Sequence, residues 1–88
     1  MICGAQIRAA RGLVKWTAAD LAERSGTNRF TIQRLEQVDG VPPSRSQTLI
    51  DLKRAFEDAG VEFIGTPEDG PGVRLRSRKI QHNLEPLE

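Results

Sequence analysis

The chain has 88 residues, 38% of them hydrophobic and 28% charged, with a formal net charge of +1. These values are typical of one small soluble domain and argue against a membrane-spanning or disordered chain. Cys3 and the distant His82 allow neither an internal disulfide nor a metal site, so we expect no metal or cofactor and assign Cys3 a structural or incidental role.

The charges are unevenly distributed along the chain. Residues 1–48 carry seven basic and four acidic side chains, residues 49–70 carry two and six, and residues 71–88 carry four and two, giving net charges of +3, −4 and +2. Such asymmetry can reflect a solvated face, but it also suits a molecule that turns one end toward a polyanion. The N-terminal residues lack a basic segment followed by a long apolar run, so we expect a cytoplasmic protein.

The first predicted helix spans about residues 5–14. This segment is rich in alanine and arginine and contains no proline. Its apolar residues recur at helical spacing, at Ile7, Ala10 and Val14.

The second predicted helix spans about residues 18–25 and has clear boundaries. Thr17 is a favourable N-cap, and Asp20 follows three residues later, as in a capping box. Gly26 can end this helix, because glycine adopts a positive φ without strain.

The third predicted helix spans about residues 28–38, with Asn28 as its N-cap. Ile32 and Leu35 form its inward stripe, with Thr31 beside them. Only about two residues separate this helix from the second, so the two helices are expected to pack at a steep angle.

A turn over residues 39–43, which contains Pro42 and Pro43, separates the third helix from a fourth over about residues 46–59. Either Ser44 or Ser46 can cap the fourth helix, and Gly60 can stop it. Its apolar face consists of Leu49, Leu52, Phe56 and Ala59.

After the fourth helix the hydrophobic period changes. Residues 61–64 and 73–76 alternate apolar with polar side chains and flank a glycine-rich stretch, which predicts a hairpin over about residues 61–76. Because a two-stranded ribbon is barely stable alone, it must pack on the helices or pair with a second copy. We therefore expect a single domain over residues 1–76 and a flexible tail over residues 77–88.

The segment from Thr17 to Glu36 has the pattern T-x-x-x-L-A-x-x-x-G-x-x-x-x-T-I-x-x-L-E. It resembles the helix-turn-helix of the phage repressor and Cro family of regulators, over roughly residues 5–59. The continuation over residues 59–76 is similar to a small bacterial subgroup in which a hairpin follows the helices. The resemblance implies a mainly α fold, a four-helix lambda-repressor-like domain followed by a C-terminal β-hairpin.

The resemblance also implies that the third helix enters the major groove of DNA and that its outward N-terminal residues contact bases. In this chain these residues are Asn28, Arg29, Phe30, Gln33 and Arg34. Arginine pairs with guanine, asparagine or glutamine with adenine, and phenylalanine can contact a thymine methyl group. The alternative for the polar residues is a solvated helix face, and for Phe30 it is packing inside the domain or a dimer.

Phosphate contacts are expected where helices begin, because free N–H groups and the helix dipole favour anions there. The candidates flank the second and fourth helices and are Thr17, Ser44, Arg45 and Ser46. Many relatives carry a glutamine directly after the N-cap of the second helix, where this chain has Ala18. The DNA contact made by that glutamine is therefore missing.

Arg11 and Glu36 match family positions that pair between the first and third helices, so the resemblance assigns them to the scaffold and not to DNA. Trp16 and Phe56 are expected in the core. The acidic residues between Asp51 and Asp69 form no catalytic pair and are expected on a solvated face that points away from DNA.

These features favour a sequence-specific, double-stranded DNA-binding transcriptional regulator, a repressor by default, in the cytoplasm and at the nucleoid of a bacterium. The alternative is a protein-interaction adapter or the antitoxin of a toxin-antitoxin pair, with a toxin as partner. An enzyme is not expected, because the chain has no phosphate loop, metal set or nucleophile with its base. Neither a membrane nor a small-molecule ligand is an expected partner.

A domain of this size reads only a few base pairs, so we expect a homodimer that binds half-sites one helical turn apart, about 34 Å. The hairpin is the expected dimerisation element, through its strand edge or its apolar side. That side consists of Val61, Phe63, Val73 and Leu75.

Overall fold

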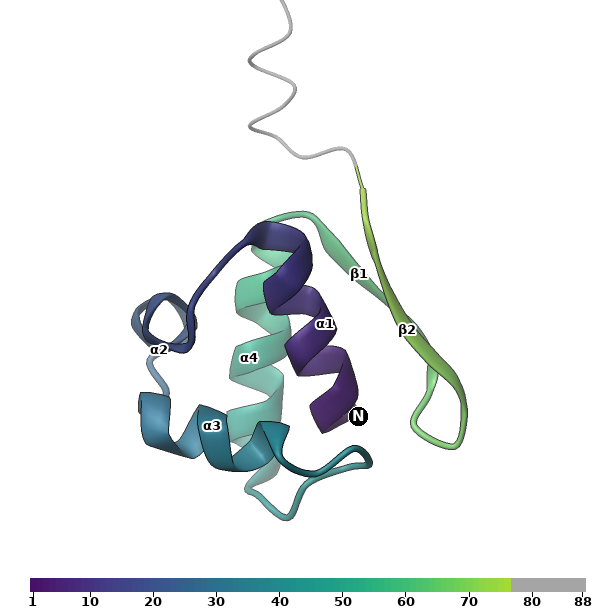
Figure 1. Ribbon diagram of the computed structural model, residues 1–88, viewed down its shortest axis with the longest axis horizontal. Coiled ribbons are helices and arrows are strands. Elements are labelled where there is room, and N and C mark those ends of the chain that lie inside the picture. The colour runs from purple at the N-terminus through teal and green to yellow at the C-terminus, as the bar shows by residue number, and fades with distance from the viewer. Residues whose placement is uncertain (77–88) are drawn as a thin grey trace, which may run out of the picture.

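The computed structural model describes residues 1–76, and the predicted flexible tail over residues 77–88 lies outside them. Four helices precede an antiparallel hairpin, in the order α1 (Gly4–Val14), α2 (Ala18–Ser25), α3 (Arg29–Glu36), α4 (Ser46–Asp58), β1 (Val61–Thr66) and β2 (Asp69–Leu75). In Figure 1, α2 and α3 lie on one side of the α1 and α4 pair and the hairpin lies on the other. The predicted helix bounds agree with these to within two residues.

Local capping accounts for the boundaries of α2 and α3. The Thr17 side chain accepts a hydrogen bond from the Asp20 N–H at 3.0 Å, and the Asp20 carboxylate accepts one from the Thr17 N–H at 2.9 Å. Gly26 follows α2 with φ of 78°, and the Asn28 side chain accepts from the Phe30 N–H at 2.7 Å. The predicted capping box, glycine stop and asparagine cap are thus confirmed.

The predicted cap of α4 was wrong. Arg45 is the N-cap residue, and its side chain makes no capping hydrogen bond. Ser44 precedes it, and Ser46 is already the first helical residue. The two serines stand on either side of Arg45, whose extended backbone marks the N-cap position. A capping side chain must belong to the residue at that position, so neither serine caps α4.

The hydrophobic core lies between the four helices and the inner side of the hairpin. Its buried residues are Ile2, Ile7, Ala10, Leu21, Ile32, Leu35, Leu49, Leu52, Ala55, Phe56 and Val61. Phe56 lies in this core and contacts two partly buried rings at its edge: it stacks on Trp16 at 5.5 Å between ring centres and meets Phe63 at 5.9 Å. Each large side chain buried in this way contributes about 1.5–3 kcal/mol of transfer free energy.

No helix within residues 1–76 has the length and apolarity that crossing a membrane requires.

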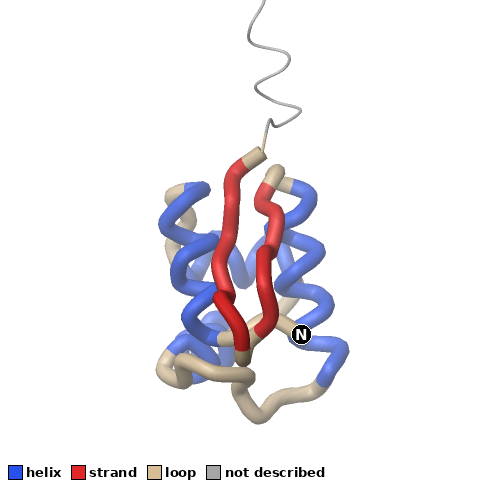
Figure 2. The backbone as a smooth tube through the Cα atoms, turned by 90° about the vertical axis from the view of Figure 1, so that its right-hand side faces the viewer, coloured by secondary structure: helices blue, strands red, loops and turns tan. Residues whose placement is uncertain are grey.

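The hairpin lies across the helices, as Figure 2 shows, and its strands contact α1 and α4. Its apolar side faces these helices. Val61 pairs with Leu75, and Phe63 pairs with Val73. Val61 is buried, while Phe63 and Val73 pack against the core from partly buried positions. The predicted use of this side for dimerisation is therefore corrected: Val61, Phe63 and Val73 contact their own helices, and of the four only Leu75 stays more exposed.

Gln6, which the sequence did not single out, fastens the hairpin to α1. Its side chain is buried and accepts a hydrogen bond from the Cys3 N–H at 3.0 Å. Its amide nitrogen donates to the carbonyl oxygens of Ile64 at 3.2 Å and Gly72 at 3.0 Å. Gln6 thus satisfies backbone groups from three segments of the chain at once.

Replacing Gln6 with methionine, which has nearly the same volume, is expected to lower the free energy of unfolding by about 1–3 kcal/mol, because one buried and two partly buried backbone groups lose their partner. Urea denaturation followed by the fluorescence of Trp16, the one tryptophan in the chain, measures this loss. Gln33→Met, at an exposed position of α3, is the matched control. Equal losses in both variants would show that Gln6 does not hold the hairpin.

Candidate nucleic-acid interface

The outer face of α3 is formed by residues that the sequence selected as base readers. Ile32 and Leu35 are completely buried, which fixes the side of α3 that faces the core. All five predicted readers are exposed: Asn28, Arg29, Phe30, Gln33 and Arg34. Helical periodicity adds Gln37, an exposed residue at the C-cap that lies seven positions after Phe30 and was missed by the sequence reasoning.

The predicted ion pair between α1 and α3 is present. Arg11 binds the Glu36 carboxylate with two hydrogen bonds, Nε to Oε2 at 2.7 Å and Nη2 to Oε1 at 2.9 Å. It also donates to the Trp16 carbonyl oxygen at 2.9 Å. The Glu36 side chain is only 9% exposed, and its hydrogen bond raises the pKa of Arg11 above the ordinary value.

Arg8 provides a second attachment between the same two helices. Its guanidinium donates to the Glu36 carbonyl oxygen at the end of α3 and to the Asp39 carboxylate at 2.6 Å. Two of the basic residues in the positive N-terminal segment, Arg8 and Arg11, are therefore committed to the scaffold. They fix the C-terminal end of α3 on α1, so the outer face of α3 has a defined orientation.

A carboxylate of the chain itself, that of Asp20, already occupies the start of α2. The Asp20 carboxylate occupies the Thr17 N–H, and this hydrogen bond, with a further one from the Thr17 hydroxyl group, lowers the pKa of Asp20. An ionised carboxylate at this helix start repels a phosphate, and it occupies one of the N–H groups that could otherwise bind the phosphate. Thr17 is consequently a poorer phosphate contact than the sequence suggested.

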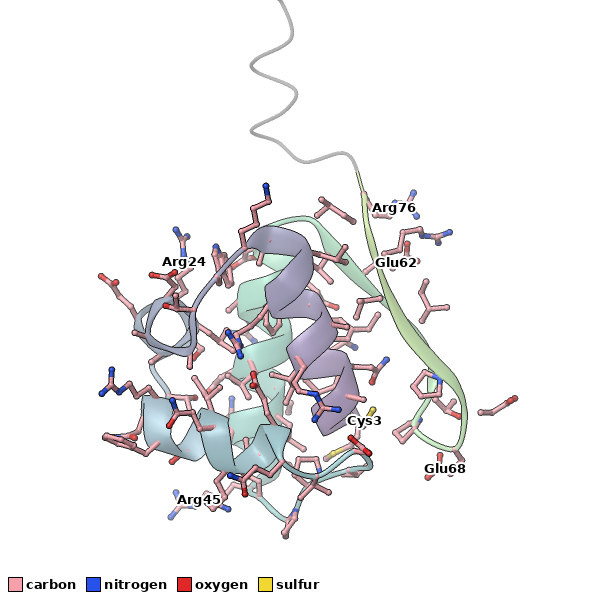
Figure 3. The ribbon with its side chains drawn as sticks, in the orientation of Figure 1. Cys3, Arg24, Arg45, Glu62, Glu68 and Arg76 are labelled. Atoms are coloured by element: carbon pink, nitrogen blue, oxygen red, sulfur yellow. The ribbon has the colours of Figure 1, made fainter. Side chains whose placement is uncertain are left out.

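The start of α4 offers better conditions for a phosphate. Its first turn contains no acidic residue, and its N-cap makes no side-chain hydrogen bond. Ser44, Arg45 and Ser46 are all exposed there. Figure 3 places Arg45 beside α3, at the opposite end of the molecule from Arg76 and Glu62. Positive charge, hydroxyl groups and a helix start therefore gather next to the outer face of α3.

In the part of the chain that the structure describes, no neighbouring carboxylate neutralises the arginines on this surface. Within residues 1–76, Arg29, Arg34 and Arg45 have no acidic group at ion-pair distance. At the far end of the molecule, by contrast, Glu62 binds both Arg74 and Arg76, at 2.8 and 2.6 Å. Among the described residues, the positive charges without an acidic partner therefore include Arg29 and Arg34 on α3 and Arg45 at the start of α4.

Phe30 is exposed on this face. Its side chain is 64% accessible, which excludes the sequence alternative that it packs inside the domain. The Arg29 guanidinium lies over its ring, with 5.0 Å between Cζ and the ring centre. The outer face therefore combines guanidinium and amide donors with one aromatic ring.

Comparison of the chain with models of known protein families, with curated proteins and with solved structures found no match. The chemistry of the interface therefore rests on its own residues. These offer a helix with an exposed polar outer face, a rigid attachment at its C-terminal end, and a basic helix start beside it.

Proposed function

We propose that this chain is a sequence-specific double-stranded DNA-binding regulator with a helix-turn-helix of the phage repressor and Cro type, formed by α2 and α3. The observation that carries the proposal is the outer face of α3, where guanidinium and amide groups are exposed and have no acidic partner among residues 1–76. The major groove of B-DNA, about 12 Å wide, admits a helix of this kind.

Base recognition would come from side chains whose donor patterns match base edges. Arg29 and Arg34 are suited to the O6 and N7 atoms of guanine, and Gln33 to the N6 and N7 atoms of adenine. The Asn28 oxygen caps α3, so Asn28 would offer DNA its amide N–H groups. Phosphate contacts would come from Ser44, Arg45 and Ser46 at the start of α4 and would fix the register of α3 in the groove.

A second copy of the chain would extend the reading surface to a palindromic site, with half-sites about 34 Å apart. The apolar side of the hairpin is covered by α1 and α4, so the contact between copies would use a strand edge or another surface. Overlap of such a site with a promoter would make the protein a repressor located at the nucleoid.

A second candidate function is a protein-interaction module, such as an antitoxin that binds its toxin. The exposed aromatic ring of Phe30 favours it, because aromatic residues are enriched at protein interfaces. Retardation of DNA in a gel with steep salt dependence supports the first function. A stable protein complex formed by a chain without DNA affinity supports the second.

Selection of bound sequences from a random double-stranded DNA library tests the proposal. An enriched palindromic site is expected, and Arg34→Ala should weaken binding to it by about 1–3 kcal/mol and relax the preference at one position. Arg45→Ala should instead weaken all sequences about equally and reduce the salt slope by about one.

Arg76→Ala is the matched control for both variants, because it removes the same charge from the opposite end of the molecule. It should leave the enriched site and the affinity nearly unchanged. Absence of any enriched sequence, or equal effects of all three substitutions, would overturn the proposal.

A further inference from the structure

The first turn of α3 presents an arginine and an aromatic ring as a cation–π pair. The Arg29 Cζ atom lies 5.0 Å from the centre of the Phe30 ring, and both side chains are exposed. No other large hydrophobic side chain is exposed on α3. The ring is thus a single apolar group on an otherwise polar helix face, and its immediate partner is a guanidinium.

A guanidinium that lies over the face of a ring keeps its hydrogen-bonding capacity. A guanidinium contacts a ring through its flat face, whereas its five N–H donors lie in its plane and point outward. The pair can therefore keep its arrangement while Arg29 donates two hydrogen bonds to one base. Phe30 would limit the orientations of the guanidinium before DNA arrives, which lowers the entropy lost on binding.

The position of the Arg29 guanidinium over the Phe30 ring bears on what the ring would meet when Arg29 binds a guanine. A guanidinium with two hydrogen bonds to guanine O6 and N7 lies near the plane of that base. A ring stacked on the guanidinium is displaced out of this plane, toward a base pair about 3.4 Å further along the helix axis. Phe30 would then face the major-groove edge of the adjacent base pair.

That edge offers one apolar group that a phenyl ring can recognise, the C5-methyl group of thymine. Cytosine presents a polar amino group, which a ring without acceptors leaves unpaired. We infer that Arg29 and Phe30 act as one reading unit for a guanine and the thymine methyl group of the adjacent base pair. This inference rests on the proposed function and names the sequence feature that α3 selects.

Removal of the thymine methyl group tests the inference. In the enriched DNA site, the thymine next to the Arg29-dependent guanine is replaced by deoxyuridine, which lacks only that methyl group. The wild-type protein should bind about fourfold more weakly, the effect of exposing one buried carbon group. The Phe30→Ala variant should bind the two DNA sites equally in a fluorescence anisotropy titration.

Three controls separate the pair from general effects. Deoxyuridine at the other thymines should change the affinity of the wild-type protein by less than the tested position. Ile50→Ala, at an exposed apolar position of α4, should retain the fourfold effect. Arg29→Lys, which keeps the charge but loses the planar fork, should lose both the guanine preference and most of the methyl effect.

The outcomes distinguish the inference from the proposed function. An enriched site without a thymine beside the guanine, or a methyl effect that persists in Phe30→Ala, overturns the reading unit and leaves DNA recognition standing. Failure of any sequence to be enriched overturns both. Circular dichroism of each variant confirms folding, which is expected because both side chains are exposed.

Discussion

Replacing Arg11 with methionine is expected to lower the free energy of unfolding by about 3–5 kcal/mol. The Glu36 carboxylate, 9% exposed, would keep its position in the protein but lose both hydrogen bonds from Arg11. The Trp16 carbonyl oxygen would lose a donor as well. Urea denaturation followed by far-ultraviolet circular dichroism measures the change at constant pH.

The exposed ion pair of α4 provides the control for this prediction. Lys53 and Glu57 lie 3.7 Å apart and are both about half exposed, so Lys53→Met should change the stability by less than about 0.5 kcal/mol. The double variant Arg11→Met with Glu36→Leu should recover part of the loss, because no buried charge then stays unpaired. An Arg11→Met loss as small as that of the control would contradict a scaffold role for this pair.

Replacing Gly4 with alanine is expected to destabilise the protein by about 3 kcal/mol, the upper end for an overpacked site. A Cβ atom at this position would lie 1.8 Å from the Val38 carbonyl oxygen and 2.6 Å from that of Leu35. Relief of this clash requires α1 to move away from the end of α3, which breaks the hydrogen bond from the Gly4 N–H to the Gly40 carbonyl oxygen at 2.9 Å. Thermal denaturation would show the loss as a lower Tm.

The same substitution elsewhere in α1 should have the opposite sign. Gly12 lies in the same helix, and a Cβ atom there would meet nothing within 4 Å. Gly12→Ala should therefore raise the stability by about 0.5–1 kcal/mol, because alanine loses less backbone entropy in a helix. If both variants shifted the Tm in the same direction, the close approach between α1 and α3 would be refuted.

The helix boundaries could be predicted because they depend on neighbouring residues. Thr17 with Asp20, Gly26 and Asn28 act within three positions of the helix ends that they define. The predicted cap of α4 was wrong for a similarly local reason. Two serines one position on either side of Arg45 were equally plausible, and nothing in the local pattern says which backbone is extended.

Apart from the ion pair between Arg11 and Glu36, which the resemblance implied, contacts between distant segments could not be predicted from the sequence pattern. Gln6 looks like an ordinary polar residue of an amphipathic helix, yet its carbonyl partners lie 58 and 66 residues further along the chain. Likewise, only the contact of Gly4 with the end of α3 reveals that this position has no room for a side chain. The alternation in the hairpin identified the apolar side correctly, but periodicity cannot tell whether α1 and α4 or a second copy covers that side.

The candidate interface was predicted more completely than its scaffold. Ile32 and Leu35 marked the inward side of α3, and the exposed side followed from the helical period. The same period places Gln37 on this side, but the resemblance implied base contacts only from the N-terminal part of the helix. The phosphate contact expected from Thr17 was weakened by the Asp20 carboxylate, because a capping box and a bound phosphate compete for the same N–H groups at a helix start.

The position of Gln6 also has a consequence for the order of folding during synthesis. α1 is translated before the hairpin, but the carbonyl groups that accept hydrogen bonds from the Gln6 side chain belong to Ile64 and Gly72. At about 5–20 residues per second, the ribosome adds the intervening residues over roughly 3 to 12 seconds. Until then α1 lacks the cover of the hairpin, so protease protection of this helix is expected to appear only after β2 has been made.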